Sequence, residues 1–354
     1  MTSGETQNAI FVTEIGKPVM AGTREIPTPG PGEVLIKVTA TQLLPHDTYA
    51  RDSGLFIADH LPYVLGTNIA GTVQSLNPKY SIGQHISGAG DPAAPIPDFA
   101  GLQEYSLLLL ANSALVPIGK SDDEAATLPV NAVTSFAALF NPKWFGFPPP
   151  WSPAAASFDY GAQSIVIIGA GSDCGRLALQ FAKSVGIGTV VGIASLSGEK
   201  ELRKFGATHV VDRHQEQSAI VKQVRQILGG EEGVTRVYDC VNWTFELAVA
   251  LVTKDEESLV ATLHQPRTVG ELLARDGKSK AQVRFVSGAA PQWGEEDTVE
   301  FWAWLKGAVE NGVVTIPSFR VLEGLDVEKV NEALDSYRDG SKVLHAVVRP
   351  GGKA

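Results

Sequence analysis

The chain has 354 residues and a formal net charge of −10 at pH 7, with 44% hydrophobic and 19% charged residues. This length allows two domains with separate cores, and the composition is that of a globular protein. The acidic balance argues against nucleic acid or an anionic membrane as a partner. No apolar run approaches the ~20 residues of a membrane helix, and the first residues show no signal-peptide pattern. The two cysteines, Cys174 and Cys240, lie in apolar segments, which favours reduced thiols and a cytoplasmic location.

The first 115 residues are predicted to form mainly strands and turns, with strands at 34–38, 69–73 and 104–110. Next, the sequence SDDE at 121–124 has the pattern of a capping box, and helical periodicity continues through Phe140. Residues 141–160 intersperse prolines with aromatic side chains, which excludes a regular helix. We expect this segment to be a connector packed onto the protein, with the alternative that its aromatic residues line a substrate entrance.

From residue 163 onward, apolar strands alternate with helical segments. This alternation predicts an α/β fold with a doubly wound sheet. Two further helices, 301–306 and 327–337, and a closing strand, 342–348, complete the chain. The predicted strands of the sheet are 165–168, 189–194, 209–212, 235–240, 259–263 and 283–286.

The stretch SIVIIGAGSDCG at 164–175 places a glycine-rich turn between a buried strand and an amphipathic helix. In α/β proteins, the backbone N–H groups of such a turn and the helix N-terminus face a dinucleotide pyrophosphate. The spacing departs from the strict G-x-G-x-x-G, so an ordinary βα turn is the alternative. We expect the cofactor to contact Gly169, Ala170, Gly171, Ser172, Asp173, Cys174 and Gly175.

The end of the second strand of this sheet indicates which nicotinamide cofactor binds. NAD enzymes usually carry an acid there, about 20 residues after the glycines, but here no acid precedes Glu199. Ser195 offers a donor and Lys200 a cation, which suits the 2′-phosphate of NADPH better than NADH. Arg203 is a further candidate, with a solvated helix face as the preferred alternative.

The chain resembles the medium-chain dehydrogenases/reductases, specifically their zinc-free quinone oxidoreductase and enoyl reductase branch. The order and spacing of several motifs carry the resemblance, and GAGSDCGR at 169–176 with DRH at 212–214 further resemble fungal biosynthetic members. The motifs are PGPGEVLIKV at 29–38, LPHDTY at 44–49, LGTNIAGTV at 65–73, AATLPVNAVT at 125–134, the glycine turn, FGATHVVD at 205–212 and GSKVLHAVV at 340–348.

This resemblance implies a discontinuous, mostly-β GroES-like catalytic domain, formed by 1–134 and 304–354. A Rossmann NADP-binding domain, 135–303, would be inserted into it, and the nicotinamide would lie in the cleft between the two. Arg213, after the third strand, matches a position where relatives contact the adenosine end, so it is expected to stack on adenine. Relatives include monomers and dimers, so a monomer or a homodimer is expected.

Metal binding is not expected. Zinc-dependent relatives have Gly-His-Glu where this chain has Gly66, Thr67 and Asn68, and neither a hydroxyl nor an amide is a good zinc ligand. Two cysteines cannot form a four-cysteine structural site. His46 beside Asp47 could form a ligand pair, but without a third ligand a polar cleft residue is favoured.

Without a metal, hydride must go to an electrophilic acceptor such as an enone, an enoyl thioester or a quinone. By resemblance, Tyr49 lines the nicotinamide cleft, Thr134 contacts the carboxamide, and Asp47 orients its neighbours. Core packing of Tyr49 and a local helix hydrogen bond of Thr134 are the alternatives. The family often has Asn where this chain has Leu44, which suggests a more apolar pocket. His46 is then a candidate for proton transfer, with outward exposure as the alternative.

Three functions follow from these observations. The first is an NADPH-dependent reductase of activated C=C bonds or quinones, acting on a small molecule in secondary metabolism. The second is a trans-acting enoyl reductase that takes an acyl chain from the carrier protein of a polyketide synthase. The third, of another class, is a catalytically silent nucleotide-binding protein.

Overall fold

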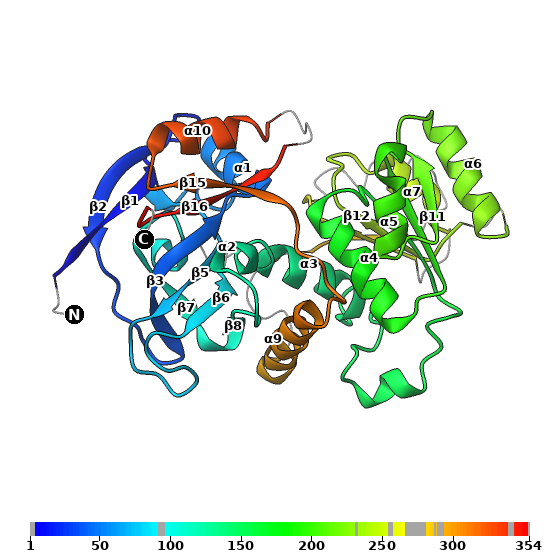
Figure 1. The fold of residues 1–354 in the computed structure, drawn as a ribbon. Coiled ribbons are helices and arrows are strands. Elements are labelled where there is room, and N and C mark those ends of the chain that lie inside the picture. Colours follow the sequence, from blue (N-terminus) through cyan, green and yellow to red (C-terminus); the bar gives the residue numbers. More distant parts are fainter. Residues whose placement is uncertain are drawn as a thin grey trace. The chain divides into compact units, whose positions relative to one another are not determined.

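The structure is a computed structural model that describes residues 4–90, 96–230, 233–253, 258–265, 281–286, 288, 294–338 and 343–352. The chain divides into two compact units (Figure 1). Unit 1 comprises Met1–Val130 and Gly288–Ala354, and unit 2 comprises Asn131–Ser287. The division expected at 303/304 falls inside helix α9 (Glu295–Glu310), and this helix belongs entirely to unit 1.

Unit 1 is built on β-strands, as expected. Its larger sheet has seven strands in the order β15-β16-β3-β5-β6-β8, with β7 pairing β3, and a smaller sheet has the order β2-β1-β4. In Figure 1 the red C-terminal strand β16 lies beside the blue strand β3, so the end of the chain completes the sheet that its beginning starts. The strands are β1 (Thr6–Val12), β2 (Met20–Glu25), β3 (Glu33–Gln42), β4 (Tyr63–Val64), β5 (Asn68–Val73), β6 (His85–Ala89), β7 (Tyr105–Leu109), β8 (Ser113–Leu115), β15 (Phe319–Glu323) and β16 (His345–Arg349).

The described helices of unit 1 are α1 (Pro45–Ser53), α2 (Asp122–Ala125), the 16-residue α9 and α10 (Val327–Asp335), with single turns at η1 (Pro97–Phe99) and η2 (Leu110–Asn112). Ser121 forms the predicted capping box, because its hydroxyl accepts from the Glu124 N–H at 3.2 Å while the Glu124 carboxylate accepts from the Ser121 N–H. The single helix expected through Phe140 is wrong. Helix α2 ends before α3 (Pro129–Phe140), since Pro129 has no N–H to continue it.

Unit 2 contains a six-stranded parallel sheet in the order β11-β10-β9-β12-β13-β14, which confirms the expected doubly wound fold. The order reverses between β9 and β12, so the switch point lies at the carboxyl ends of these two strands. The strands are β9 (Ser164–Ile168), β10 (Thr189–Ala194), β11 (His209–Asp212), β12 (Arg236–Asp239), β13 (Leu259–Thr262) and β14 (Gln282–Phe285).

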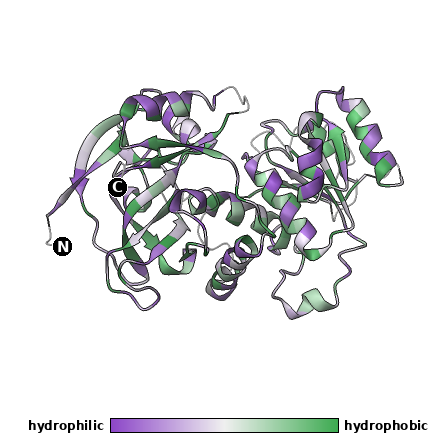
Figure 2. Ribbon diagram, in the orientation of Figure 1, coloured by the Kyte–Doolittle hydropathy of each residue, from purple (hydrophilic) through white to green (hydrophobic). Residues whose placement is uncertain are grey.

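The helices that the structure describes in unit 2 are α3 (from Asn131 on), α4 (Asp173–Val185), α5 (Glu199–Phe205), α6 (Gln217–Ile227) and α7 (Glu246–Leu251), with turns η3 (Pro153–Ala156) and η4 (Leu196–Gly198). Figure 2 shows hydrophilic and hydrophobic residues alternating along α4 and α6, as expected of helices that cover one face of a sheet. The 141–160 segment is packed through buried aromatic side chains, including Phe147 at 1% exposure. Among the described residues, no helix is long and apolar enough to cross a membrane.

Candidate functional site

The glycine turn after β9 is held by hydrogen bonds within unit 2. Gly169 takes a positive φ of 76°, and its N–H and that of Ala170 both donate to the Ile193 carbonyl of β10. Ser172 caps helix α4, since its hydroxyl accepts from the Gly175 N–H at 3.1 Å and donates to the Gly169 carbonyl at 2.8 Å. The turn is therefore fixed, and the N-terminus of α4 begins directly after it.

The fold requires two of the three glycines of this turn. A Cβ on Gly169 would come within 2.5 Å of a Val241 methyl, and one on Gly175 would collide with backbone atoms of Gly169 and Ala170. At Gly171 the φ angle is outside the left-handed region, and the atom nearest to an added Cβ would be 3.9 Å away, on Ala194. The fold therefore explains two of the glycines but leaves open space at Gly171. A ligand that approaches the backbone closely, as a pyrophosphate does, fits this space.

The other residues of the turn differ in their exposure to solvent. Ala170 and Cys174 are buried, so they can offer a ligand only their backbone groups. Burial raises the pKa of the Cys174 thiol to about 12, which keeps it neutral near pH 7. Ser172 and Asp173 are partly exposed beside the open position.

Ser195 and Arg213 follow neighbouring strands, because Ala194 of β10 pairs with Asp212 of β11. Ser195 opens η4 with its hydroxyl 3.0 Å from that of Ser197, and Arg213 is exposed. Lys200 is exposed on α5 and forms no ion pair with the described residues.

Arg203, the further candidate for the 2′-phosphate, is engaged within unit 2. It donates to the Glu199 carboxylate at 2.8 Å and to the Thr208 carbonyl at 2.7 Å. This agrees with the helix-surface alternative, and Lys200 is the better candidate for the phosphate.

In unit 1, Asp47 anchors the start of α1. Its carboxylate accepts from the Leu44 N–H at 2.7 Å and from the Gly66 N–H at 3.1 Å, and the residue is 1% exposed. With both oxygens occupied and no access to solvent, Asp47 holds the helix against the loop that contains Gly66. The orienting role in catalysis that the resemblance implies for Asp47 stays a prediction.

His46 contacts Thr67 rather than pointing only outward. Its Nε2 lies 3.1 Å from the Thr67 hydroxyl, and its side chain is 24% exposed. The two residues form an imidazole–hydroxyl pair that reaches solvent at one end, an arrangement that can move a proton.

The residues at the zinc position of the dehydrogenases do not fit a zinc ion. Thr67 is hydrogen-bonded to His46, and the Asn68 amide donates to Gln42 at 2.8 Å and accepts from the Val130 N–H at 2.7 Å. Two groups of a kind that zinc binds lie nearby, but the His46 imidazole is hydrogen-bonded to Thr67, and the Asp47 carboxylate accepts from backbone N–H groups. The zinc position itself offers only a hydroxyl and an amide already in use, where zinc requires thiolate, imidazole or carboxylate. In the described part of the chain, no cluster of three His, Cys, Asp or Glu side chains could hold a metal ion.

The remaining two predicted residues belong to different units. Tyr49 lies on α1 in unit 1 and is partly exposed, whereas Thr134 lies on α3 in unit 2 and is 4% exposed. Their expected contacts with the nicotinamide stay predictions.

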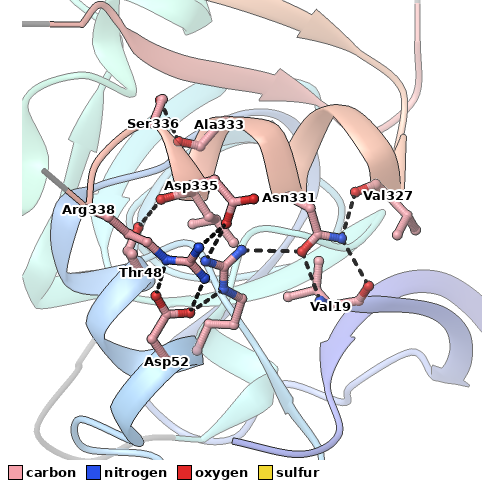
Figure 3. Close-up of polar contacts among 11 residues, drawn as sticks. Val19, Thr48, Asp52, Val327, Asn331, Ala333, Asp335, Ser336 and Arg338 are labelled. Carbon is pink, nitrogen blue, oxygen red and sulfur yellow. Dashed lines mark hydrogen bonds and ion pairs between the residues drawn. The ribbon is translucent and has the colours of Figure 1, made fainter. Parts of the chain in front are cut away.

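An ionic network, absent from the sequence-based predictions, fixes the second half of α1 (Figure 3). Arg51, only 2% exposed, donates to Asp52 and to Asp335 of α10, each at 2.7 Å. Arg338 also donates to Asp52 at 2.7 Å, and the Thr48 hydroxyl donates to an α10 carbonyl. The helix that carries His46 is therefore held at both ends.

The loop after β12 is a further feature that sequence reasoning missed. The Asp239 carboxylate accepts from the N–H groups of Val241 and Asn242, at 3.2 and 3.0 Å, and from the Asn242 amide at 3.0 Å. Trp243 follows, stacked on His264 after β13 with ring centroids 3.8 Å apart. An Asp at a strand end followed three residues later by Asn was the available signal, but its importance depends on the strand order.

Two family models match the chain. Residues 30–98 match the alcohol dehydrogenase GroES-like domain, and residues 174–276 match the zinc-binding dehydrogenase model. The chain is 25% identical to dehydrogenase orsE of Emericella nidulans, over 97% of this chain and 99% of that protein. It is 31% identical to trans-enoyl reductase tazE of Aspergillus terreus, over 58% of this chain and 68% of that protein. The structure of Escherichia coli quinone oxidoreductase complexed with NADPH superposes with a TM-score of 0.75 at 19% identity, covering 97% and 100% of the two chains.

Proposed function

The chain belongs to the medium-chain dehydrogenase/reductase family of oxidoreductases, and on that premise we propose that it is an NADPH-dependent, metal-free reductase. Its acceptor is an activated C=C bond or a quinone on a small molecule of a secondary-metabolite pathway. The observation that carries the proposal is the open space at Gly171 within an otherwise fixed turn. The similarity to the trans-enoyl reductase tazE and the dehydrogenase orsE supports the reaction type.

The residues present fit a dinucleotide phosphate. The turn from Gly169 to Gly175 would hold the pyrophosphate through backbone N–H groups and the α4 N-terminus. Ser195 and the exposed Lys200 would bind the 2′-phosphate, and Arg213 would lie against the adenine. NADPH, when bound, supplies a hydride from C4 of its nicotinamide ring. No step of the reaction is assigned to a metal, because Thr67 and Asn68 use their polar atoms within the fold.

The acceptor gains one hydride and one proton. Hydride addition to an enone or enoyl thioester places negative charge on the carbonyl oxygen. In the proposal, the Tyr49 hydroxyl donates a hydrogen bond to that oxygen and stabilises it. The His46–Thr67 pair, 3.1 Å apart and open to solvent, is the candidate path for the proton.

The first experiment measures NADPH and NADH binding by calorimetry, then NADPH oxidation against a panel of quinones, enones and enoyl thioesters. Tighter binding of NADPH and turnover of at least one acceptor class are expected. A protein that binds neither NADPH nor NADH would refute the proposal. Binding without oxidation of any acceptor would favour the silent nucleotide-binding protein.

A trans-acting enoyl reductase is the second candidate, because tazE is named as one. The same acyl chain would be offered on a carrier protein and on a small thiol. A carrier-bound substrate turned over far faster than its small-thiol ester would favour this candidate, and equal rates would favour a free small molecule.

A further inference from the structure

In the part of the chain that the structure describes, β14 is the last strand on one side of the parallel sheet. Gln282 and Val286 donate their N–H groups to carbonyls in and next to β13, at 3.0 and 2.8 Å. Because alternate residues of a strand point their backbone groups to opposite sides, Val283 and Phe285 direct theirs away from β13. Such an edge is a template for pairing with another chain unless something covers it.

The side chain of Trp144 covers part of this edge. Its indole N–H donates to the Phe285 carbonyl at 3.2 Å, and Trp144 is only 8% exposed. From β14, the Arg284 guanidinium donates in turn to the Lys143 carbonyl. Two neighbouring residues of the 141–160 segment are therefore bonded to two neighbouring residues of the edge strand. A buried indole N–H needs an acceptor, and here it uses one that a further strand would otherwise use.

The segment that carries Trp144 is fixed within unit 2 by contacts of its own. Before Trp144, the Asn141 side chain accepts from the Lys143 N–H at 2.9 Å, and the Asn141 carbonyl accepts from the Trp144 N–H at 2.9 Å. After it, the N–H groups of Phe145 and Phe147 donate to carbonyls of α3 at 3.1 and 3.0 Å. The indole is therefore held against β14 by backbone contacts on both sides of it.

We propose that Trp144 protects the edge of the sheet and keeps β14 from pairing with β14 of a second copy of this chain. A second copy is the partner that this edge fits, because two identical edge strands can pair antiparallel across a two-fold axis. That pairing would need the Phe285 carbonyl, which Trp144 occupies. The inference is independent of the proposed function, because it involves neither the glycine turn nor the acceptor.

The test removes the cover and measures the mass of the particle by size-exclusion chromatography with light scattering. Trp144→Ala lacks both the ring and the N–H donor, so its mass should rise with concentration toward twice the wild-type value. Trp144→Phe keeps a ring but no donor and should associate less. Trp151→Ala is the matched control, because it removes another indole of the same segment, one that stacks on Phe136 with ring centroids 5.2 Å apart. This control should keep the wild-type mass.

A second substitution assigns the new contact to β14. Val283→Pro removes an N–H group that points away from β13, so it blocks pairing at the edge and keeps the hydrogen bonds within the sheet. Trp144→Ala combined with Val283→Pro should return to the wild-type mass. Melting followed by circular dichroism shows which variants are folded, and Trp144→Phe carries the comparison if Trp144→Ala does not fold. A folded Trp144→Ala with the wild-type mass at every concentration would overturn the inference. Association that survives Val283→Pro would also overturn it, as would a wild-type dimer that Val283→Pro alone dissociates.

Discussion

Gly171→Ala should separate nucleotide binding from stability. In the folded chain the added Cβ would lie 3.9 Å from its nearest neighbour, Ala194, so it causes no collision and no backbone strain. Replacing glycine by alanine at a compatible position stabilises a fold by about 0.4–1 kcal/mol, because the unfolded chain loses freedom. The melting temperature should therefore stay the same or rise by about 1–4 °C. The affinity for NADPH should fall.

The loss of affinity follows from the space that the methyl group takes. A phosphate held away from the turn loses at least one charge-assisted hydrogen bond, worth about 1.5–3 kcal/mol. This corresponds to roughly tenfold to hundredfold weaker binding. Calorimetry with NADPH and 2′,5′-ADP should show the same loss for both, since both carry the phosphates that lie on the adenosine side.

Gly169→Ala is the informative control, because it changes the same turn but is expected to destabilise the fold. Its positive φ costs an alanine about 1–2 kcal/mol, and the contact with Val241 adds about 1–3 kcal/mol of overpacking. This variant should melt several degrees lower. Gly171→Ala with wild-type NADPH affinity, or with a melting temperature as low as that of Gly169→Ala, would refute the argument that position 171 is kept open for a ligand.

Four further outcomes are expected. Lys200→Ala should weaken NADPH about tenfold to hundredfold and leave NADH nearly unchanged, and equal wild-type affinities for the two cofactors would contradict this assignment. Tyr49→Phe should lower kcat about tenfold to a thousandfold with little change in KM, and unchanged kcat on every accepted substrate would remove Tyr49 from the mechanism. Elemental analysis should find no stoichiometric zinc, and chelators should leave activity intact. One tightly bound zinc per chain would refute the metal-free proposal. Arg51→Met should cost about 1–3 kcal/mol in urea unfolding, because its two carboxylate partners are partly exposed and water compensates part of the loss. Burial raises the pKa of the Asp52 carboxyl, but hydrogen bonds from Arg338 and Arg51 outweigh it and hold the pKa below 3.8. The stability from this group is thus present above pH 3.8 and lost as pH falls through the lower folded value, and Arg51→Met should reduce that acid dependence.

The sequence by itself determined the strands of unit 2 to within a residue or two. The run 165–168 is continuously apolar, fully buried and followed by a glycine, and local pattern suffices where both faces of a strand are buried. It also determined the glycine turn and the helix after it, since the residues that form them are adjacent in the chain. The sequence pattern did not show the break between α2 and α3. Helical periodicity continued across Pro129, which has no backbone N–H to donate.

Contacts between distant segments were decided only by the tertiary structure. The carboxylate of Asp47 meets the Gly66 N–H, and Arg51 meets Asp335 nearly 300 residues away. Trp243 and His264 looked unremarkable in sequence, and they share an edge only because β12 and β13 pair in parallel. No local periodicity encodes which strand pairs with which. That choice depends on burying apolar faces across the whole sheet, and it alone brings these side chains together.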